Sequence, residues 1–153
     1  MQSTAALLTP PAMIVNSDLL GPTTVQDDEL LTFPAGLYGL PECRSFVLLN
    51  AQRDGCYWLQ SVDHAALAFL LIDPFRFCEG FSVDLGAAEV LDLGAEKAAD
   101  IAVLAIVTLP RTRDDGATAN LQGPIAINLS ARLARQLAVP ESPFGLREPI
   151  ELS

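Results

Sequence analysis

The sequence predicts a mainly all-β fold, a small barrel or a sandwich. Apolar or alternating runs of about four to eight residues recur along the chain, and Gly, Pro, Asn and Asp separate them. Stretches with the spacing of an amphipathic helix are few. The chain has 153 residues and 50% of them are hydrophobic, so it can form one domain with its own core.

Six strands are expected in the first half of the chain, and turn residues separate them. The segment Leu20-Gly21-Pro22 between the first two predicts a hairpin, and Pro34 with Gly36 stops the third. Residues 50–55 predict a turn, and Asp73-Pro74 ends the sixth strand. The expected strands cover residues 13–15, 23–25, 30–33, 45–49, 57–61 and 68–72.

Two neighbouring strands are expected in the second half. Residues 101–108 are an apolar run without helical spacing. Residues 118–128 follow, and Gln122-Gly123-Pro124 within them predicts a turn, because glycine reaches unusual φ values and proline restricts the residue before it. This second strand carries the amides of Asn120 and Asn128, which we interpret as groups that bind a partner.

Helix is expected in two short places. Asp84 is the predicted N-cap of a helix through Leu91 that ends at Gly94, and residues 95–99 predict a single turn. Residues 130–137 fit two structures. Good helix formers with Leu133 and Leu137 at i, i+4 favour a helix, whereas their polar and apolar alternation also fits a strand.

The charge balance restricts the classes of partner. The chain has 9 basic and 19 acidic residues, a net charge of −10. No basic cluster is present, and neutralising phosphates requires one, so we expect no direct binding of nucleic acid. A negative surface instead attracts cationic partners.

Cysteine spacing and hydropathy indicate a cytoplasmic protein. The cysteines Cys43, Cys56 and Cys78 are odd in number and widely spaced, as expected for reduced thiols. No apolar run reaches the length of about 18 residues that suggests a membrane span. Residues 1–12 are expected to be a weakly ordered extension, and residues 13–153 the domain.

The residues that could support catalysis are few. His64 is the only histidine; it follows Asp63 and lies three residues after Ser61. Members of a catalytic triad approach from separate parts of a fold, and three residues of one turn cannot do so easily. A small hydrolase using these residues is therefore the weakest alternative, and we expect no metal or cofactor site. Phe75 and Phe77 lie in a loop that is hard to bury, and aromatic residues often dominate binding surfaces.

Taken together, six segments of the chain resemble the FliW family of flagellar assembly factors. Each segment alone is a weak signature, but their order and spacing are specific, and the resemblance covers about residues 13–150. It implies a closed or nearly closed barrel of antiparallel strands with one or two short helices, and a strand at residues 132–137. The segments are residues 31–40 (LTFPAGLYGL), 46–49 (FVLL), 58–61 (WLQS), 67–69 with 72–75 and Phe77, 118–128 preceded by 106–108, and 144–149 (FGLREP).

The resemblance also implies a function without catalysis. Members of this family bind newly made flagellin in the cytoplasm. They also bind CsrA, an RNA-binding repressor of flagellin translation. Binding of one partner therefore changes how much protein is available to the other. Asp27, Asp28, Glu29 and Asp63 are then expected to contact CsrA, since a protein that holds RNA is cationic. Phe75 and Phe77 are expected to line a groove for flagellin. A monomer is favoured, and a β-barrel interaction module of another complex is the alternative.

Overall fold

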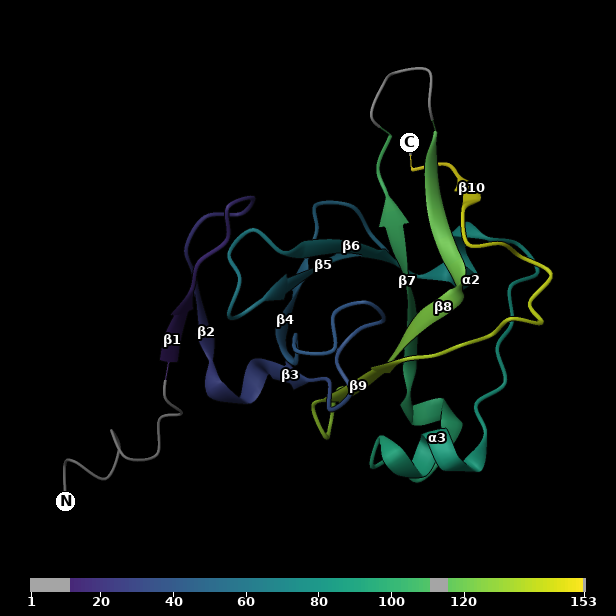
Figure 1. Cartoon of the computed structure of the whole chain (residues 1–153), viewed down its shortest axis with the longest axis horizontal. Coiled ribbons are helices and arrows are strands. Elements are labelled where there is room, and N and C mark those ends of the chain that lie inside the picture. Colours follow the sequence, from purple (N-terminus) through teal and green to yellow (C-terminus); the bar gives the residue numbers. More distant parts are fainter. Residues whose placement is uncertain (1–11, 111–115, 153) are drawn as a thin grey trace.

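Seven strands form a barrel in the computed structural model, which describes residues 12–110 and 116–152 (Figure 1). Neighbouring strands pair in an unbroken order, and the ring closes where the last strand pairs with the first. The order is β8 (Ala117–Asn128), β7 (Ala102–Thr108), β6 (Ala68–Ile72), β5 (Cys56–Ser61), β4 (Ser45–Asn50), β3 (Leu30–Thr32) and β9 (Leu133–Gln136). The predicted all-β barrel is confirmed, although the β3–β9 pair is parallel.

One of the two main clusters of buried side chains contains residues from the barrel strands and the loop after β3. Phe33 and Phe46 meet edge to face with their ring centroids 5.1 Å apart, and Leu59 and Leu71 pack beside them without exposure. Leu31 of β3 and Phe46 of β4 are paired and both are fully buried, so alternate side chains of these strands point into the barrel. Burial of these large apolar groups is the main force that holds the barrel together.

Three further strands lie outside the barrel ring. β1 (Ala12–Val15) and β2 (Thr23–Gln26) form the predicted hairpin, and Val15 and Val25 pack it against Val47 of β4. β10 (Glu148–Ile150) pairs with the first residues of β8. The predicted extension covers residues 1–12. Residues 1–11 lie outside the described residues, and Ala12 is the first residue of β1.

The helical segments differ from the prediction in their boundaries. α3 (Ala87–Asp92) has Gly86 at its N-cap, so the predicted capping by Asp84 is wrong, although Gly94 adopts a left-handed φ of 68° after its last turn. α2 (Pro74–Phe77) was expected to be loop; the Asp73 side chain accepts the N–H of Phe75 and starts it. The 3-10 turns are η1 (Asp27–Glu29) and η2 (Ala98–Asp100). None of the described helices is long and apolar enough to cross a membrane.

β9 is a strand, as the family resemblance implied, so helix propensity gave the wrong answer for residues 133–136. β9 pairs with β8 along its whole length and buries Ala134 and Gln136. A helix at these residues could pair with neither β8 nor β3, so the barrel would not close. Tertiary contacts therefore override a local preference of a few tenths of a kcal/mol per residue.

β8 is one continuous strand, so the predicted turn at Gln122-Gly123-Pro124 is wrong. The segment is a bulge: Leu104 faces Ile125 whereas Ile106 faces Asn120, so β8 has extra residues here. The side-chain oxygen of Asn120 accepts the N–H groups of Gln122 (3.1 Å) and Gly123 (2.9 Å) and holds the bulge. A Cβ on Gly123 would lie 2.9 Å from Nε2 of Gln136, so a side chain here would displace that amide, whereas the φ of Gly123 is not left-handed.

Asn128 connects the end of β8 to α3. Its side chain is 3% exposed; Nδ2 donates to the carbonyl of Leu93 (2.8 Å), and Oδ1 accepts the N–H of Ser130 (3.1 Å). The amide therefore satisfies the buried carbonyl at the end of α3, 35 residues away, and also holds the turn that follows β8.

We predict that Asn128→Ala lowers the free energy of unfolding by about 1–3 kcal/mol, because it leaves the buried carbonyl of Leu93 without its partner. Urea denaturation followed by the fluorescence of Trp58 measures this change. The exposed Asn16 is the matched control, and Asn16→Ala should change stability by less than about 0.5 kcal/mol. Equal effects of the two substitutions would contradict the assigned role.

The three cysteine side chains are buried and free, and burial raises the pKa of each thiol. The neutral form is therefore favoured in the folded state. We predict slow labelling by Ellman's reagent at about pH 8 and fast labelling in urea, because the thiolate is the reactive form. Since the folded pKa is raised, stability should decline as pH rises above the ordinary thiol value of about 8.5. Rapid labelling of a thiol in the folded protein would contradict its burial.

Candidate functional site

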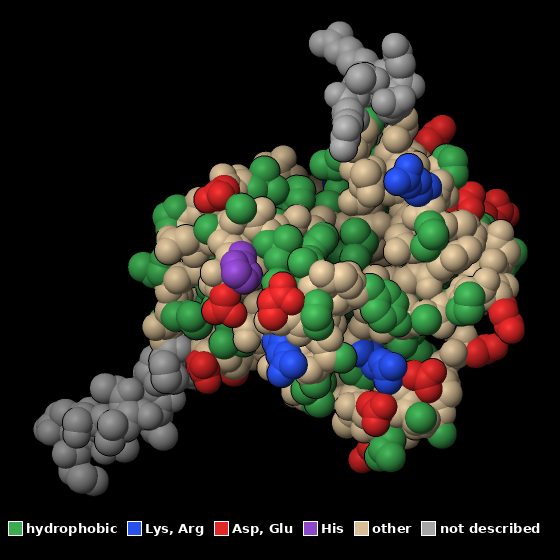
Figure 2. Space-filling model, in the orientation of Figure 1, with side chains coloured by type: hydrophobic (Ala, Val, Ile, Leu, Met, Phe, Trp, Pro, Cys, Tyr) green, Lys and Arg blue, Asp and Glu red, His purple; other side chains and the backbone are tan. Residues whose placement is uncertain are grey.

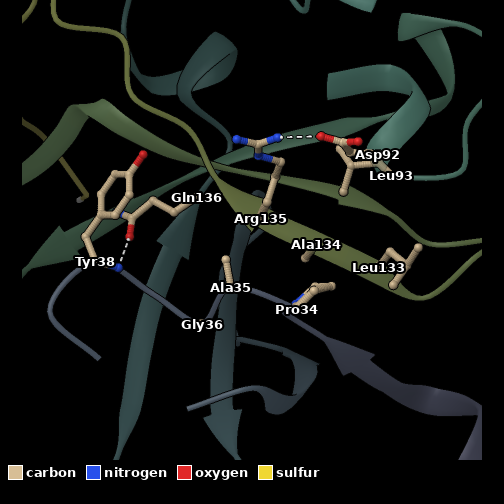
Figure 3. Close-up of a pocket in the computed structure, with 10 residues that line it drawn as sticks. All are labelled: Pro34, Ala35, Gly36, Tyr38, Asp92, Leu93, Leu133, Ala134, Arg135 and Gln136. Carbon is tan, nitrogen blue, oxygen red and sulfur yellow. Dashed lines mark hydrogen bonds and ion pairs between the residues drawn. The ribbon is translucent and has the colours of Figure 1, made fainter. Parts of the chain in front are cut away.

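The barrel separates between β3 and β9, and we call the opening the seam slot. The slot has a volume of about 410 Å³, within the range of about 300–1,000 Å³ that is usual for ligand pockets. Figure 3 shows the segment from Pro34 to Tyr38 running along one side of β9. The lining residues are Pro34, Ala35, Gly36, Tyr38, Asp92, Leu93, Leu133, Ala134, Arg135 and Gln136.

Pro34 ends the pairing of β3 with β9. The N–H of Thr32 donates to the carbonyl of Arg132 (3.0 Å), and Thr32 faces Leu133 in the single register pair of these strands. In a parallel ladder the next bond of this kind would come from the N–H of residue 34 to the carbonyl of Ala134. Proline has no N–H, so the ladder stops and the two segments separate.

The backbone of Ala134 and Gln136 faces the slot. The N–H of Leu137 donates to the carbonyl of Pro124 on β8 (2.8 Å), so residue 137 and, two residues back, Arg135 direct their backbone groups toward β8. Antiparallel pairs alternate, and the intervening Ala134 and Gln136 therefore direct theirs away from β8. Outside the strand ladders of the described residues, no hydrogen bond uses the carbonyl of Ala134 or the backbone N–H of Gln136.

Side chains define one end and the rim of the slot. Gln136 spans one end, where Oε1 accepts the N–H of Tyr38 (2.9 Å) and Nε2 donates to the carbonyl of Gly123 (2.9 Å). At the rim, Arg135 forms an ion pair with Asp92 of α3 at 3.2 Å (Figure 3). These two are the charged residues among those that line the slot, and they neutralise one another.

The predicted acidic residues are exposed at two places. Asp27, Asp28 and Glu29 form η1 between β2 and β3, and the Glu29 carboxylate accepts the N–H of Gln26 (2.8 Å). The guanidinium of Arg132 donates to the carbonyls of Glu29 and Leu30 and holds this turn against the start of β9.

Asp63 lies in the turn between β5 and β6 with the exposed His64. Ser61 is only 1% exposed, and its hydroxyl accepts the backbone N–H of His64 (3.1 Å). The hydroxyl therefore stabilises the turn. Ser61 thus contacts the backbone of His64, whereas a catalytic triad would need a contact with its imidazole ring. No group of three His, Cys, Asp or Glu side chains that could hold a metal gathers within residues 12–110 and 116–152.

The two phenylalanines of α2 have different environments. Phe75 is 54% exposed and meets the buried Phe81 edge to face at 5.2 Å. Phe77 packs against the core cluster that contains Cys56 and Cys78. Phe75 is thus available at the surface, whereas Phe77 mainly supports the fold.

Asn120 and Asn128 serve the fold through their side-chain amides, as described above. The sequence reading missed the slot, where Tyr38, Arg135 and Gln136 come together. A proline directly after an expected strand was the available signal, but it was interpreted only as a strand end.

Comparisons with known proteins cover nearly the whole of this fold. The family described as "FliW protein" matches residues 14–150. A flagellar assembly factor FliW of Natranaerobius thermophilus is 31% identical over 139 residues, which cover 90% of this chain and 92% of that protein. A FliW of Bdellovibrio bacteriovorus is 36% identical over 143 residues, covering 90% and 79%.

A crystal structure of the flagellar assembly factor FliW superposes with a TM-score of 0.82 at 29% identity, and it covers 90% of this chain and 96% of that chain. The similarity therefore includes the barrel, the segment after β3 and β9. From sequence and fold together, the chain belongs to the FliW family.

Proposed function

We propose that this protein is a flagellar assembly factor that binds flagellin and the RNA-binding repressor CsrA in the cytoplasm. The observation that carries the proposal is the family match over residues 14–150, together with relatives that are named flagellar assembly factors. In this proposal the protein works as a monomer that holds other proteins and performs no catalysis.

Competition between the partners would couple flagellin translation to flagellin export. A protein occupied by flagellin is unavailable to CsrA, and export of flagellin frees it. The freed protein then withdraws CsrA from its RNA. The coupling is reciprocal, because each partner must lower the apparent affinity of the other by the same factor.

The charge of the chain supports the CsrA part of the proposal. The net charge is −10, and acidic side chains lie around an area of hydrophobic side chains on the face in Figure 2. An RNA-binding protein carries cationic residues, so opposite charges would speed its encounter with this surface. Asp27, Asp28 and Asp63 are exposed and are the proposed contacts, with Glu29 beside them.

The exposed ring of Phe75 supports the flagellin part. An apolar side chain that stands on a well-packed partner, here Phe81, is pre-ordered for contact and loses little entropy on binding. An amphipathic helix of flagellin is the proposed occupant of this surface. Asn120 and Asn128 would act indirectly, by holding the strand, rather than by touching a partner.

Affinity capture tests the proposal as a whole. The tagged protein is mixed with lysate from its own organism after flagellar secretion has been blocked, and captured proteins are identified by mass spectrometry. Recovery of flagellin and CsrA, and displacement of CsrA by added flagellin, would support the proposal. Recovery of neither, with the barrel folded, would contradict it and favour an interaction module of another complex.

We predict that Asp27→Lys combined with Asp28→Lys weakens CsrA binding at least about 10-fold at about 50 mM salt. The difference should shrink at about 300 mM, because salt screens exposed charges over about 10 Å or less in this range. Glu29 is left unchanged, since its carboxylate accepts the N–H of Gln26. Calorimetric titration measures the affinity.

The matched control combines Asp84→Lys with Glu141→Lys, which changes net charge equally at two other exposed acidic positions. A local contact requires the first pair to weaken binding more than the control pair. Equal losses would show that only total charge matters, and no loss in either would remove the electrostatic argument.

We predict that Phe75→Ala weakens flagellin binding by more than about 1 kcal/mol, as truncation of a buried aromatic contact does. Leu129→Ala is the control, because Leu129 is 47% exposed and lies at the end of β8. Phe77 is unsuitable for this test since it packs in the core cluster. Unchanged flagellin affinity in a folded Phe75→Ala protein would exclude this surface.

A further inference from the structure

We propose that Arg53 and Arg76 together bind one carboxylate on the flagellin helix that docks at Phe75. The inference rests on the proposed function and deepens it, because it states which chemical group that helix carries. The contact surface then continues from α2 to a groove on the outer face of the barrel, beside Trp58.

Two exposed guanidinium groups lie beside the turn between β4 and β5. Arg53 belongs to this turn, and Arg76 belongs to α2. The N–H of Asp73, at the start of α2, donates to the carbonyl of Gly55 in the turn (2.9 Å) and joins the two segments. A Cβ on Gly55 would lie 3.0 Å from Cδ of Arg76, so the Arg76 stem lies directly on the turn. Burial raises the pKa of the Cys56 thiol, and both guanidinium groups oppose this effect, as positive charges close to the same thiol do.

Neither guanidinium group has a partner in the described part of the chain. The ion pair found there joins Arg135 to Asp92. The described hydrogen bonds of arginine side chains come from Arg44, Arg132 and Arg135. Like charges placed near one another repel, and an anion between them replaces this repulsion with attraction. Arg53 and Arg76 are therefore arranged for a negatively charged group that comes from another molecule.

The surroundings favour a carboxylate over a phosphate. A guanidinium group presents forked N–H donors that match the two oxygens of a carboxylate. Asp54 follows Arg53 directly and Asp73 begins α2, so a phosphate, with its greater negative charge, would be repelled here. An Asp or Glu side chain carries a single charge, which the two guanidinium groups outweigh.

The groove beside Arg53 adds an apolar contact. Leu59 points into the barrel core, so its neighbour Trp58 lies on the outer face, where it pairs with Leu70 of β6. These two half-buried side chains line a groove of about 420 Å³, which we call the Trp58 groove. Leu20, between β1 and β2, lines it at 38% exposure, and Arg53 is its one charged lining residue. A ligand of this site therefore combines a carboxylate with a large apolar side chain.

The arginine pair lies between two apolar contacts. Phe75 is 54% exposed and directly precedes Arg76 in α2, and the Trp58 groove lies beside Arg53. An amphipathic helix that covered this surface with a wholly apolar stripe would take both guanidinium groups out of water without pairing them, which is costly. A stripe that contains one Asp or Glu pairs them. The surface therefore selects a helix whose apolar face is interrupted by a carboxylate.

Removal of the two charges tests the pairing. Arg53→Gln combined with Arg76→Gln should weaken the binding of purified monomeric flagellin at least about 10-fold. The matched control combines Lys97→Gln with Arg147→Gln, which removes the same charge at two other exposed positions and should keep the affinity within about twofold. CsrA should bind both variants at least as tightly as the original protein, because both are more negative.

The matching carboxylate is then located on flagellin. Each Asp and Glu of flagellin is replaced by its amide, one at a time, and one replacement should reproduce the loss. On that flagellin variant, Arg53→Gln with Arg76→Gln should weaken binding by less than about a further twofold, because the pair is already broken.

The Trp58 groove has its own readout, because Trp58 is the only tryptophan of the chain. Full-length protein labelled with 5-fluorotryptophan therefore gives a single ¹⁹F NMR signal, and flagellin should shift it. Leu20→Ala should weaken flagellin binding at least about 3-fold, whereas Leu146→Ala, at a residue that is 61% exposed, should change it by less than about twofold.

The outcomes separate the inference from the proposed function. Full flagellin affinity in the variant without the two arginine charges, or an equal loss in the control pair, would overturn the inference and leave the proposed function intact. An unmoved ¹⁹F signal would do the same, and this measurement uses the unsubstituted protein, so it decides even where a substitution unfolds the barrel. A loss of CsrA binding alone would assign the arginines to CsrA and overturn the inference. Failure of the original protein to bind flagellin would overturn the proposed function itself.

Discussion

The barrel of this protein depends on a seam that is closed by a single register pair. Thr32 and Leu133 form that pair, and Pro34 prevents the following bond because it has no N–H. Other contacts must therefore hold the ring closed. The guanidinium of Arg132 donates to the carbonyls of Glu29 in η1 and Leu30 in β3, and the Gln136 side chain joins Tyr38 to Gly123 at one end of the slot. The same interruption that weakens the pairing creates the seam slot.

The seam also connects parts of the chain that would otherwise be independent. Arg132 holds η1, so the acidic side chains of the proposed CsrA surface are carried on the same closure as the slot. Asp92 at the slot rim belongs to α3, whose end Asn128 fixes through the carbonyl of Leu93. Arg132 directly precedes β9, Arg135 lies in β9, and Asn128 lies in β8, which pairs with β9, so η1, α3 and the slot all adjoin the same pair of strands. Such shared elements are the physical means by which one partner can influence another.

Much of the fold was predictable because strands show an apolar and polar alternation with a period of two residues. Strands such as β4, β5 and β6 alternate or are wholly apolar and are bounded by Gly, Asn or Pro, so their existence and approximate ends follow from the sequence. The bulge in β8 was not predictable in the same way. Gln122-Gly123-Pro124 has turn chemistry, and only the side chains of Asn120 and Gln136, which fill the space beside Gly123, decide that the strand continues.

For the candidate site, too, some features follow from the sequence and others only from the tertiary structure. By itself the sequence determined an all-β body, an acidic surface at Asp27, Asp28 and Asp63, and the family to which the six segments point, because charge and hydrophobic spacing are local properties. The tertiary structure alone decided that β9 pairs with both β8 and β3, that Phe75 is exposed while Phe77 is packed, and that Pro34 lies beside β9 at the seam slot. These outcomes depend on which backbones lie side by side when the ring closes, and residues about a hundred positions apart carry no local signal of that pairing.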